Sequence, residues 1–283
     1  MHTHCEDKST MDRPNTATLD GDNYLLIRDS AEDMRLHCQH LIWELHTQYI
    51  LSPDIPVTEH MRIADIGAGN GVWPFHLSQK VPSTVQIDGY DISSASFPPP
   101  STLPQNVKLD LLNALSEPPE SLRGVYDVVH VRLWCFVIRG NDPDALVRTV
   151  GYLLKPGEYI QWEDVCRDAE LVQPGPTQTF ENAYTRFLQR YDINMEWVRH
   201  VPERLRDAGF EVIRHSDGPF EKLVEAMYFD NYVSAALRVL GADETVAREA
   251  MAHIVQDLSR RGRDDIRLPF RSLALVARSA GTV

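Results

Sequence analysis

Apolar residues recur at helical spacing from residue 30 onward. They fall at i, i+4, i+7, i+8, i+11 and i+15, on one face of a helix, and are Met34, Cys38, Leu41, Ile42, Leu45 and Tyr49. Ser30 followed by Asp33 resembles a capping arrangement for the start of this helix, and Pro53 and Pro56 end it and begin a linker. The pattern predicts an amphipathic helix with this face apolar.

Short apolar runs then alternate with helical or loop stretches. The strand-like runs are MRIADIG, TVQIDGYDI, VKLDLL, YDVVHV and GEYIQWED, and the helical ones are GVWPFHLSQKV and PDALVRTVGYLL. Strands that alternate with helices favour βαβ units, so we expect an α/β fold with a mostly parallel sheet.

The alternation breaks after residue 166. A loop leads into a helix with an apolar stripe of Phe180, Tyr184, Phe187, Leu188 and Tyr191. The run VPERLRDAGFEVIRH predicts a helix that ends at Gly209 and leads into a strand. Helices are expected around 221–239 and 243–260, and RSLALVARS supplies a last strand. FPPPSTLP, residues 97–104, predicts a stiff extended loop.

The composition is that of one large globular domain or of a domain with an elaborate insertion. The chain has 283 residues, of which 43% are hydrophobic, enough to bury a full core. We expect residues 1–20 to form a disordered tail and residues 21–283 a single domain. No run approaches ~18 apolar residues, so no membrane span is expected, and the polar N-terminus lacks the apolar run of a secretory signal.

The charge balance is acidic. Lys and Arg number 28 and Asp and Glu 41, so the net charge is −13. Nucleic acids and anionic membranes are bound through Lys and Arg, so neither is an expected partner. The cysteines form no CxxC pair and are Cys5, Cys38, Cys135 and Cys166. This spacing is typical of reduced thiols in a cytoplasmic protein. His2 and His4 beside Cys5 could chelate a metal, but on a mobile terminus we expect no metal site.

The stretch ADIGAGNGVWP, residues 64–74, places Gly67, Gly69 and Gly71 at every second position between a strand and a helix. Such a loop lets a nucleotide-type ligand lie against bare backbone. The dinucleotide fingerprint GxGxxG would need Gly or Ala at the position of Val72. The GxxxxGK[ST] phosphate loop is absent from the sequence.

What remains is an acidic-x-GxGxG pattern that begins at Asp65, and it resembles motif I of the class I S-adenosylmethionine-dependent methyltransferases. The resemblance implies a doubly wound, mostly parallel seven-stranded α/β sheet with helices on both faces, a helical N-terminal cover and helical insertions. It also implies S-adenosylmethionine as cofactor and S-adenosylhomocysteine as product. Asp91, about twenty residues beyond the loop, would accept both ribose hydroxyl protons. Asn113 stands where the family usually has an aspartate for the adenine amino group, with Asp110 as a fallback.

Three further stretches narrow the resemblance. YLLIRDSAEDMRLHCQHLIW, YDVVHVRL and LLKPGEYIQWED resemble the fungal secondary-metabolite methyltransferases, which include the gliotoxin-type thiol methyltransferases and a methyltransferase-like regulator. The similarity runs from Tyr24 to Asp164 and is weaker beyond. Glu158 replaces the second glycine of the family's KPGG. The [DN]PP[YFW] motif of enzymes that methylate nucleobases or protein glutamine is absent after the fourth strand, where His130 to Trp134 stand.

The same resemblance divides the domain into functional parts. A helical cover is expected at 21–58 and the cofactor-binding core at 59–165. Helical lid or substrate insertions are expected at 166–200 and 219–262, and the final helix and strands at 201–218 and 263–283.

The residues expected to bind the cofactor lie in the glycine loop, at the ends of strands, or on the cover. They are Tyr24, Arg35, Asp65, Gly67, Ala68, Gly69, Gly71, Asp91, Ile92, Asn113, Ala114, His130 and Val131. Tyr24 and Arg35, with Gln39, would close over the methionine end of the cofactor, as in related enzymes, or form an ordinary helix face. Trp73 packs either on the cofactor or in the core.

Methyl transfer from a sulfonium is an in-line displacement that needs alignment and exclusion of water more than a reactive protein group. His130 would shape the methyl site or relay a proton, or be a hydrogen-bonded core histidine. Glu163 is a candidate general base, or a solvated carboxylate at a strand end. The aromatic stripe around Tyr184, and the cluster of Met227, Tyr228, Phe229 and Tyr232, form either plain core or a partly apolar acceptor pocket.

We therefore expect methyl transfer to a small molecule, and by resemblance the first choice is the thiol of a sulfur-bearing fungal-type metabolite. A thiol is already partly ionised near neutrality, so it needs less help from a base than an alcohol does. O- or N-methylation stays open, as does a catalytically silent cofactor-binding regulator. A nicotinamide oxidoreductase is disfavoured by Val72. No obligate protein partner is expected.

Overall fold

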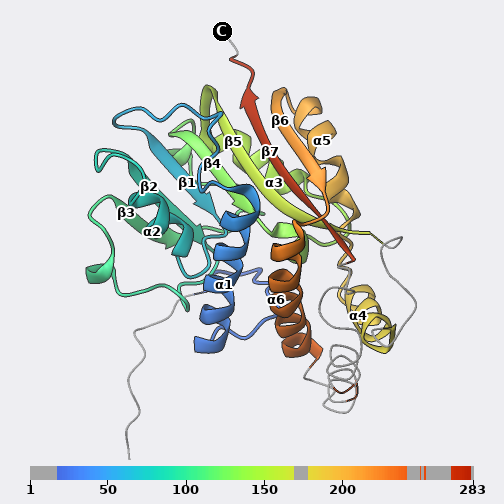
Figure 1. The fold of residues 1–283 in the computed structure, drawn as a ribbon. Coiled ribbons are helices and arrows are strands. Elements are labelled where there is room, and N and C mark those ends of the chain that lie inside the picture. The colour runs from blue at the N-terminus through green and yellow to red at the C-terminus, as the bar shows by residue number, and fades with distance from the viewer. Residues whose placement is uncertain (1–17, 169–177, 241–248, 250–251, 253–268, 282–283) are drawn as a thin grey trace, which may run out of the picture.

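The computed structural model describes residues 18–168, 178–240, 249, 252 and 269–281 (Figure 1). Most of the predicted tail, residues 1–20, and the helix expected around 243–260 fall outside these residues. Among the described residues, no helix combines the length and apolar character needed to cross a membrane.

The described strands form a single sheet in the order β3-β2-β1-β4-β5-β7-β6. They are β1 (Arg62–Ile66), β2 (Gln86–Asp91), β3 (Val107–Leu111), β4 (Tyr126–Arg132), β5 (Leu154–Arg167), β6 (Phe210–Gly218) and β7 (Phe270–Ser279). Neighbours among the first five strands pair in parallel, whereas β7 runs antiparallel to both β5 and β6. The predicted doubly wound, mostly parallel seven-stranded sheet is confirmed.

Helices flank this sheet, each in a stretch that the sequence predicts as helical. They are α1 (Ser30–Thr47), α2 (Val72–Ser78), α3 (Asp144–Leu153), α4 (Gln178–Arg190), α5 (Val201–Asp207) and α6 (Lys222–Leu240). Because helices cover both faces, the central strands are apolar on both sides, and Ile63 of β1 and Val128 and Val129 of β4 are fully buried.

The order of the strands predicts a ligand crevice at the carboxyl ends of the central strands β1 and β4. β1 pairs with β2 on one side and with β4 on the other, so the chain winds outward in both directions from this point. In open parallel sheets, ligands bind at such a switch point, beyond the carboxyl ends of the strands. Figure 1 shows α1 and α6, from opposite halves of the chain, side by side near the carboxyl end of β1.

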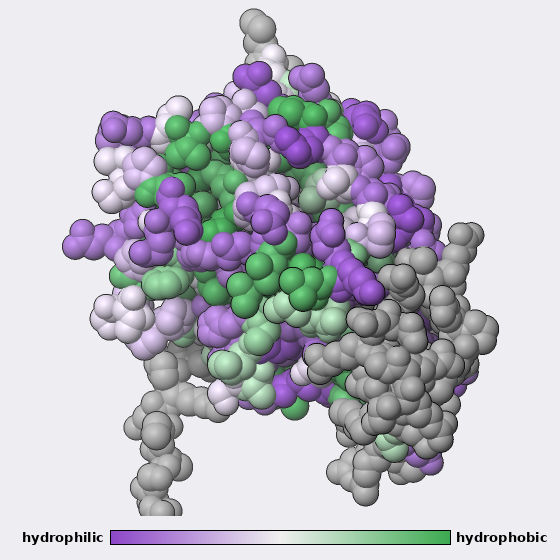
Figure 2. Space-filling model, viewed as in Figure 1, coloured by the Kyte–Doolittle hydropathy of each residue, from purple (hydrophilic) through white to green (hydrophobic). Residues whose placement is uncertain are grey.

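The first helix begins at Ser30 as expected, but its N-cap is Asp29, whose side chain accepts a hydrogen bond from the backbone N–H of Glu32. The predicted apolar face is wrong for most of its residues. Met34 is 63% exposed and Leu41 47% exposed, and Figure 2 shows apolar side chains at the surface over this helix.

The inward face of α1 instead carries polar residues beside two apolar ones: Glu32, Arg35, His40, Ile42 and Trp43 are buried. The reason is that α1 packs against the crevice and α6, where charged side chains find partners, and leaves part of its apolar face to water. Isolated apolar residues at a protein surface are common.

Candidate functional site

The glycine loop between β1 and α2 holds three left-handed backbone positions. The φ angles are 82° at Gly67, 58° at Gly69 and 76° at Gly71, a region that L side chains avoid. A Cβ added to Gly67 would lie 2.9 Å from Nε1 of Trp134. The glycines therefore meet both a conformational and a spatial requirement.

Asp91, the last residue of β2, holds this loop from the neighbouring strand. Its Oδ2 accepts a hydrogen bond from the N–H of Gly69 at 2.9 Å, and its Oδ1 accepts one from the N–H of Ser93 at 3.1 Å. Burial raises the pKa of Asp91 despite these two donors, because the carboxylate lacks the solvation it would have in water. Further hydrogen-bond donors would therefore stabilise its charge.

A cavity of about 220 Å³ opens in front of the loop. It brings together most of the residues predicted to bind a cofactor: Tyr24, Arg35, Asp65, Gly67, Ala68, Gly69, Asp91, Ile92, Asn113, Ala114 and His130. Gly71, Val131 and Glu163 are not among its lining residues. A Cβ on Gly71 would meet Leu109 at 2.8 Å, so this glycine serves packing beneath the loop, and Val131 is fully buried in β4.

The N-terminal cover contributes a buried charged cluster to the same cavity. The hydroxyl of Tyr24 donates to Oε1 of Glu32 at 2.7 Å, and Glu32 accepts from Nε and Nη2 of Arg35 at 3.0 and 2.7 Å. Nη1 of Arg35 donates to Oδ1 of Asn231 on α6 at 3.0 Å. Sequence reasoning missed Glu32 and Asn231, although a glutamate three residues before Arg35 on a helix is a recognisable pairing signal.

His130 of β4 lines the cavity and belongs to a buried network. Its Nδ1 is 2.7 Å from Oδ1 of Asp65, its Nε2 is 3.5 Å from Oε2 of Glu163, and its ring stacks on Trp73 at 3.9 Å. Burial lowers the pKa of His130, but the two carboxylates outweigh this, and the net effect raises it.

Both ring nitrogens of His130 face a buried carboxylate, so the structure favours positioning over proton transfer for this histidine. Glu163 is 2% exposed and accepts a hydrogen bond from Nε2 of Gln161 at 2.8 Å. The interpretation of Glu163 as a solvated carboxylate is therefore wrong, and Glu163 does not line the cavity.

The candidate adenine residue is fixed by the segment before α1. The side-chain nitrogen of Asn113 donates to the carbonyl of Asp20 at 3.0 Å, and its oxygen accepts from the N–H of Leu115 at 3.0 Å. The oxygen keeps one further lone pair for a ligand. The fallback Asp110 is half-exposed and pairs with Lys108 at 2.6 Å, away from the cavity lining.

Aromatic side chains also line the cavity. Among them are Phe136, Tyr184, Tyr228, Tyr232 and Phe270. Both predicted interpretations, plain core and acceptor pocket, therefore apply to different residues. Phe229 is buried in the core and does not line the cavity, whereas Tyr228 and Tyr232 do. The side chain of Phe180 lies outside the described residues.

Comparison with known proteins finds similarity to methyltransferases. A family model for the methyltransferase domain matches residues 39–215. Methyltransferase grgD of Penicillium sp is 35% identical over 151 residues, which are 50% of this chain and 52% of that protein. N-methyltransferase sirN of Leptosphaeria maculans is 32% identical over 150 residues, 52% of this chain and 51% of that protein. The chain thus spans about half the length of these two relatives.

A solved structure supports the fold. Geranyl diphosphate C-methyltransferase from Streptomyces coelicolor A3(2), in complex with Mg²⁺, geranyl-S-thiolodiphosphate and S-adenosylhomocysteine, matches with a TM-score of 0.53 at 13% identity. The match covers 86% of this chain and 76% of that chain.

Proposed function

The chain belongs to the methyltransferase domain family, and on that premise we propose that it transfers a methyl group from S-adenosylmethionine to a small secondary metabolite. The observation that carries the proposal is that one cavity is lined both by the glycine loop with Asp91 and by a set of aromatic side chains.

The residues of the cavity fit an adenosyl sulfonium. Gly67 and Gly69 line the cavity with backbone alone, so a ligand can approach the chain closely there. Asp91 offers a carboxylate for the ribose hydroxyls, and the oxygen of Asn113 offers an acceptor for the adenine amino group. Buried Glu32 and Arg35 carry the two charges that complement an amino-acid zwitterion.

The cofactor supplies an electrophilic methyl group whose carbon–sulfur bond breaks as the bond to the acceptor forms, leaving S-adenosylhomocysteine. The chain's own part is to align the acceptor and to exclude water. The aromatic residues Tyr184, Tyr228 and Tyr232 are buried and support an apolar, ring-bearing acceptor. The proton lost by the acceptor leaves to solvent.

We propose sulfur or nitrogen, rather than an alcohol oxygen, as the acceptor atom. His130 is hydrogen-bonded to Asp65 and has its other ring nitrogen 3.5 Å from Glu163, and Glu163 does not line the cavity, which argues against either as the base for an alcohol. A thiol ionises near neutrality, which supports the sulfur-bearing metabolite suggested by the sequence. The name of the sirN relative supports nitrogen equally.

A cytoplasmic location belongs to the same proposal. The cysteines of the described chain, Cys38, Cys135 and Cys166, are all free thiols, which supports a reducing compartment.

The test is turnover of the full chain with S-adenosylmethionine and matched thiol, amine and alcohol acceptors on one ring scaffold, with S-adenosylhomocysteine measured by mass spectrometry. We expect product with the thiol or the amine and none with the alcohol. Binding of S-adenosylhomocysteine without turnover on any acceptor would instead favour a silent regulator. Absence of binding would remove the proposal altogether.

A further inference from the structure

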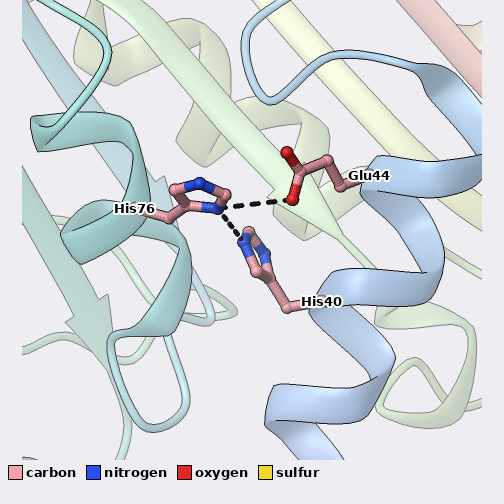
Figure 3. A group of neighbouring side chains, drawn as sticks. All are labelled: His40, Glu44 and His76. Carbon is pink, nitrogen blue, oxygen red and sulfur yellow. Dashed lines mark hydrogen bonds and ion pairs between the residues drawn. The ribbon is translucent and has the colours of Figure 1, made fainter.

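Three potential metal ligands meet between α1 and α2, outside the cofactor cavity. His40 and Glu44 lie one turn apart on α1, and His76 comes from α2 (Figure 3). Nε2 of His40 is 2.9 Å from Nδ1 of His76, and the latter is 3.5 Å from Oε2 of Glu44. Figure 3 shows the three side chains pointing toward one another across the gap between the helices.

These spacings suit a small tetrahedral cation. With zinc–ligand distances of about 2.0–2.1 Å, the ligand atoms of a tetrahedral site lie roughly 3.3 Å apart. The two measured spacings bracket that value, and all three ligand atoms lie within 4.8 Å of one another. Small side-chain rotations would therefore place all three at bonding distance from one metal ion.

Burial divides the site into a closed side and an open side. His40 is 5% exposed, whereas the side chains of His76 and Glu44 are 28% and 31% exposed. A metal held here has a route to solvent and space for a water as its fourth ligand. Two imidazole nitrogens and one carboxylate oxygen form a ligand set that zinc accepts.

We propose that His40, Glu44 and His76 bind a divalent transition metal, zinc in the first place, which ties the cover helix α1 to α2 directly after the glycine loop. No local sequence pattern predicts this site, because its third ligand comes from a different helix. The proposal does not depend on methyl transfer.

Arg132 competes with the metal. Its Nη2 lies 3.2 Å from Nδ1 of His40, so without metal it donates to that nitrogen, and the proton on Nε2 of His40 is shared with His76. When a metal takes Nε2, this proton moves to Nδ1 and the arginine must turn away. The guanidinium of Arg132 can then pair with Glu163, since Oε2 of Glu163 is 3.8 Å from Nη1 of Arg132.

The experiment titrates the full chain with Co²⁺ and follows the visible absorption of the tetrahedral ion, then displaces it with Zn²⁺. His2, His4 and Cys5 are first replaced by alanine to remove the chelating terminus. His76→Ala is compared with His37→Ala, which removes an exposed histidine of the same helix α1. We expect His76→Ala to weaken binding at least about 10-fold, since loss of even an outer-shell partner costs 10–100-fold, and His37→Ala to leave it unchanged.

Two further variants keep the test decisive. Glu44→Gln retains the shape of the side chain and should weaken Zn²⁺ binding while the metal-free melting temperature stays the same. Arg132→Met should strengthen Zn²⁺ binding several-fold, an effect that a purely structural histidine pair would not produce. Equal Co²⁺ affinity in the parent, His76→Ala and Glu44→Gln proteins would overturn the proposal, as would a parent protein that binds neither metal.

Discussion

Replacing Asp91 by alanine should weaken the binding of S-adenosylhomocysteine about 150-fold. The carboxylate already accepts N–H bonds from Gly69 and Ser93 and lies in the cavity wall with its charge poorly solvated. Two added bonds from ribose hydroxyls, each charge-assisted and worth about 1.5 kcal/mol at the lower end, amount to about 3 kcal/mol. At 1.4 kcal/mol per tenfold, this is the stated loss.

The assay is isothermal titration calorimetry with S-adenosylhomocysteine on the wild type, Asp91→Ala and the matched control Asp110→Ala. Asp110 also lies near the end of a strand, but its ion pair with Lys108 is solvent-exposed, with side chains 52% and 68% exposed, so its loss should change the affinity less than about 3-fold.

A second ligand separates direct contact from an effect through the loop. Asp91 also orders Gly69, so its removal could disturb the loop alone. With an analogue that lacks both ribose hydroxyls, the wild type and Asp91→Ala should bind within about 3-fold of each other, because the ribose bonds are already gone. An equal loss with both ligands would refute the ribose contact, and unchanged affinity for S-adenosylhomocysteine would refute the role of Asp91 altogether.

Three further predictions concern stability and the cover. Gly67→Ala should lower the free energy of unfolding, measured in urea, by about 3 kcal/mol, because of left-handed strain and contact with Trp134. The control Gly157→Ala, at φ 83° with open space around it, should lower it by only about 1 kcal/mol. Equal losses would contradict the packing argument. Burial raises the pKa of Asp164 to about 6, above its unfolded value, so its contribution to stability falls as pH rises. The loss in the free energy of unfolding caused by Asp164→Asn, measured in urea, should be about 1 kcal/mol smaller at pH 7 than at pH 5. A loss that is the same at both pH values would contradict this. Tyr24→Phe removes a hydrogen bond of 2.7 Å to the buried glutamate of α1 and should raise the KM for S-adenosylmethionine about 5–10-fold with little change in kcat; an unchanged KM would show that the cover does not help to bind the cofactor.

The parts of the site that depend on local sequence could be predicted. Gly67, Gly69 and Asp91 are placed by the strand–loop–helix pattern and by a fixed distance along the chain, so no knowledge of long-range packing is needed. Gly71 fits the same pattern but does not line the cavity. The same holds for the strands themselves, because central strands buried on both faces read as apolar runs.

The contacts of His130 could not be predicted, because they depend on strand register. His130 pairs with Asp65 across β1 and β4, and Arg132 of β4 pairs with Glu163 of β5. A shift of one residue in either pairing would point the partners to opposite faces. The sequence places each residue near a strand end but does not specify the pairing.

The orientation of α1 was mispredicted for a different reason. Hydrophobic periodicity assumes that the apolar face is buried, yet this helix lines the cavity with Glu32 and Arg35 and pairs Arg35 with Asn231 of α6. Buried charges need partners. Glu32 lies three residues from Arg35 on the same helix, but Asn231 lies 196 residues away in the chain, beyond the reach of any local pattern.

That pairing of distant helices has a consequence for how the protein is made. On the ribosome, the glycine loop and the first strands emerge long before Asn231. The nascent chain therefore carries the glycine loop and Arg35 before the residue of α6 that pairs with Arg35 has been made. A polypeptide that ends before α6 would lack the contact between Arg35 and Asn231. It would also lack the residues of α6 that line the cavity.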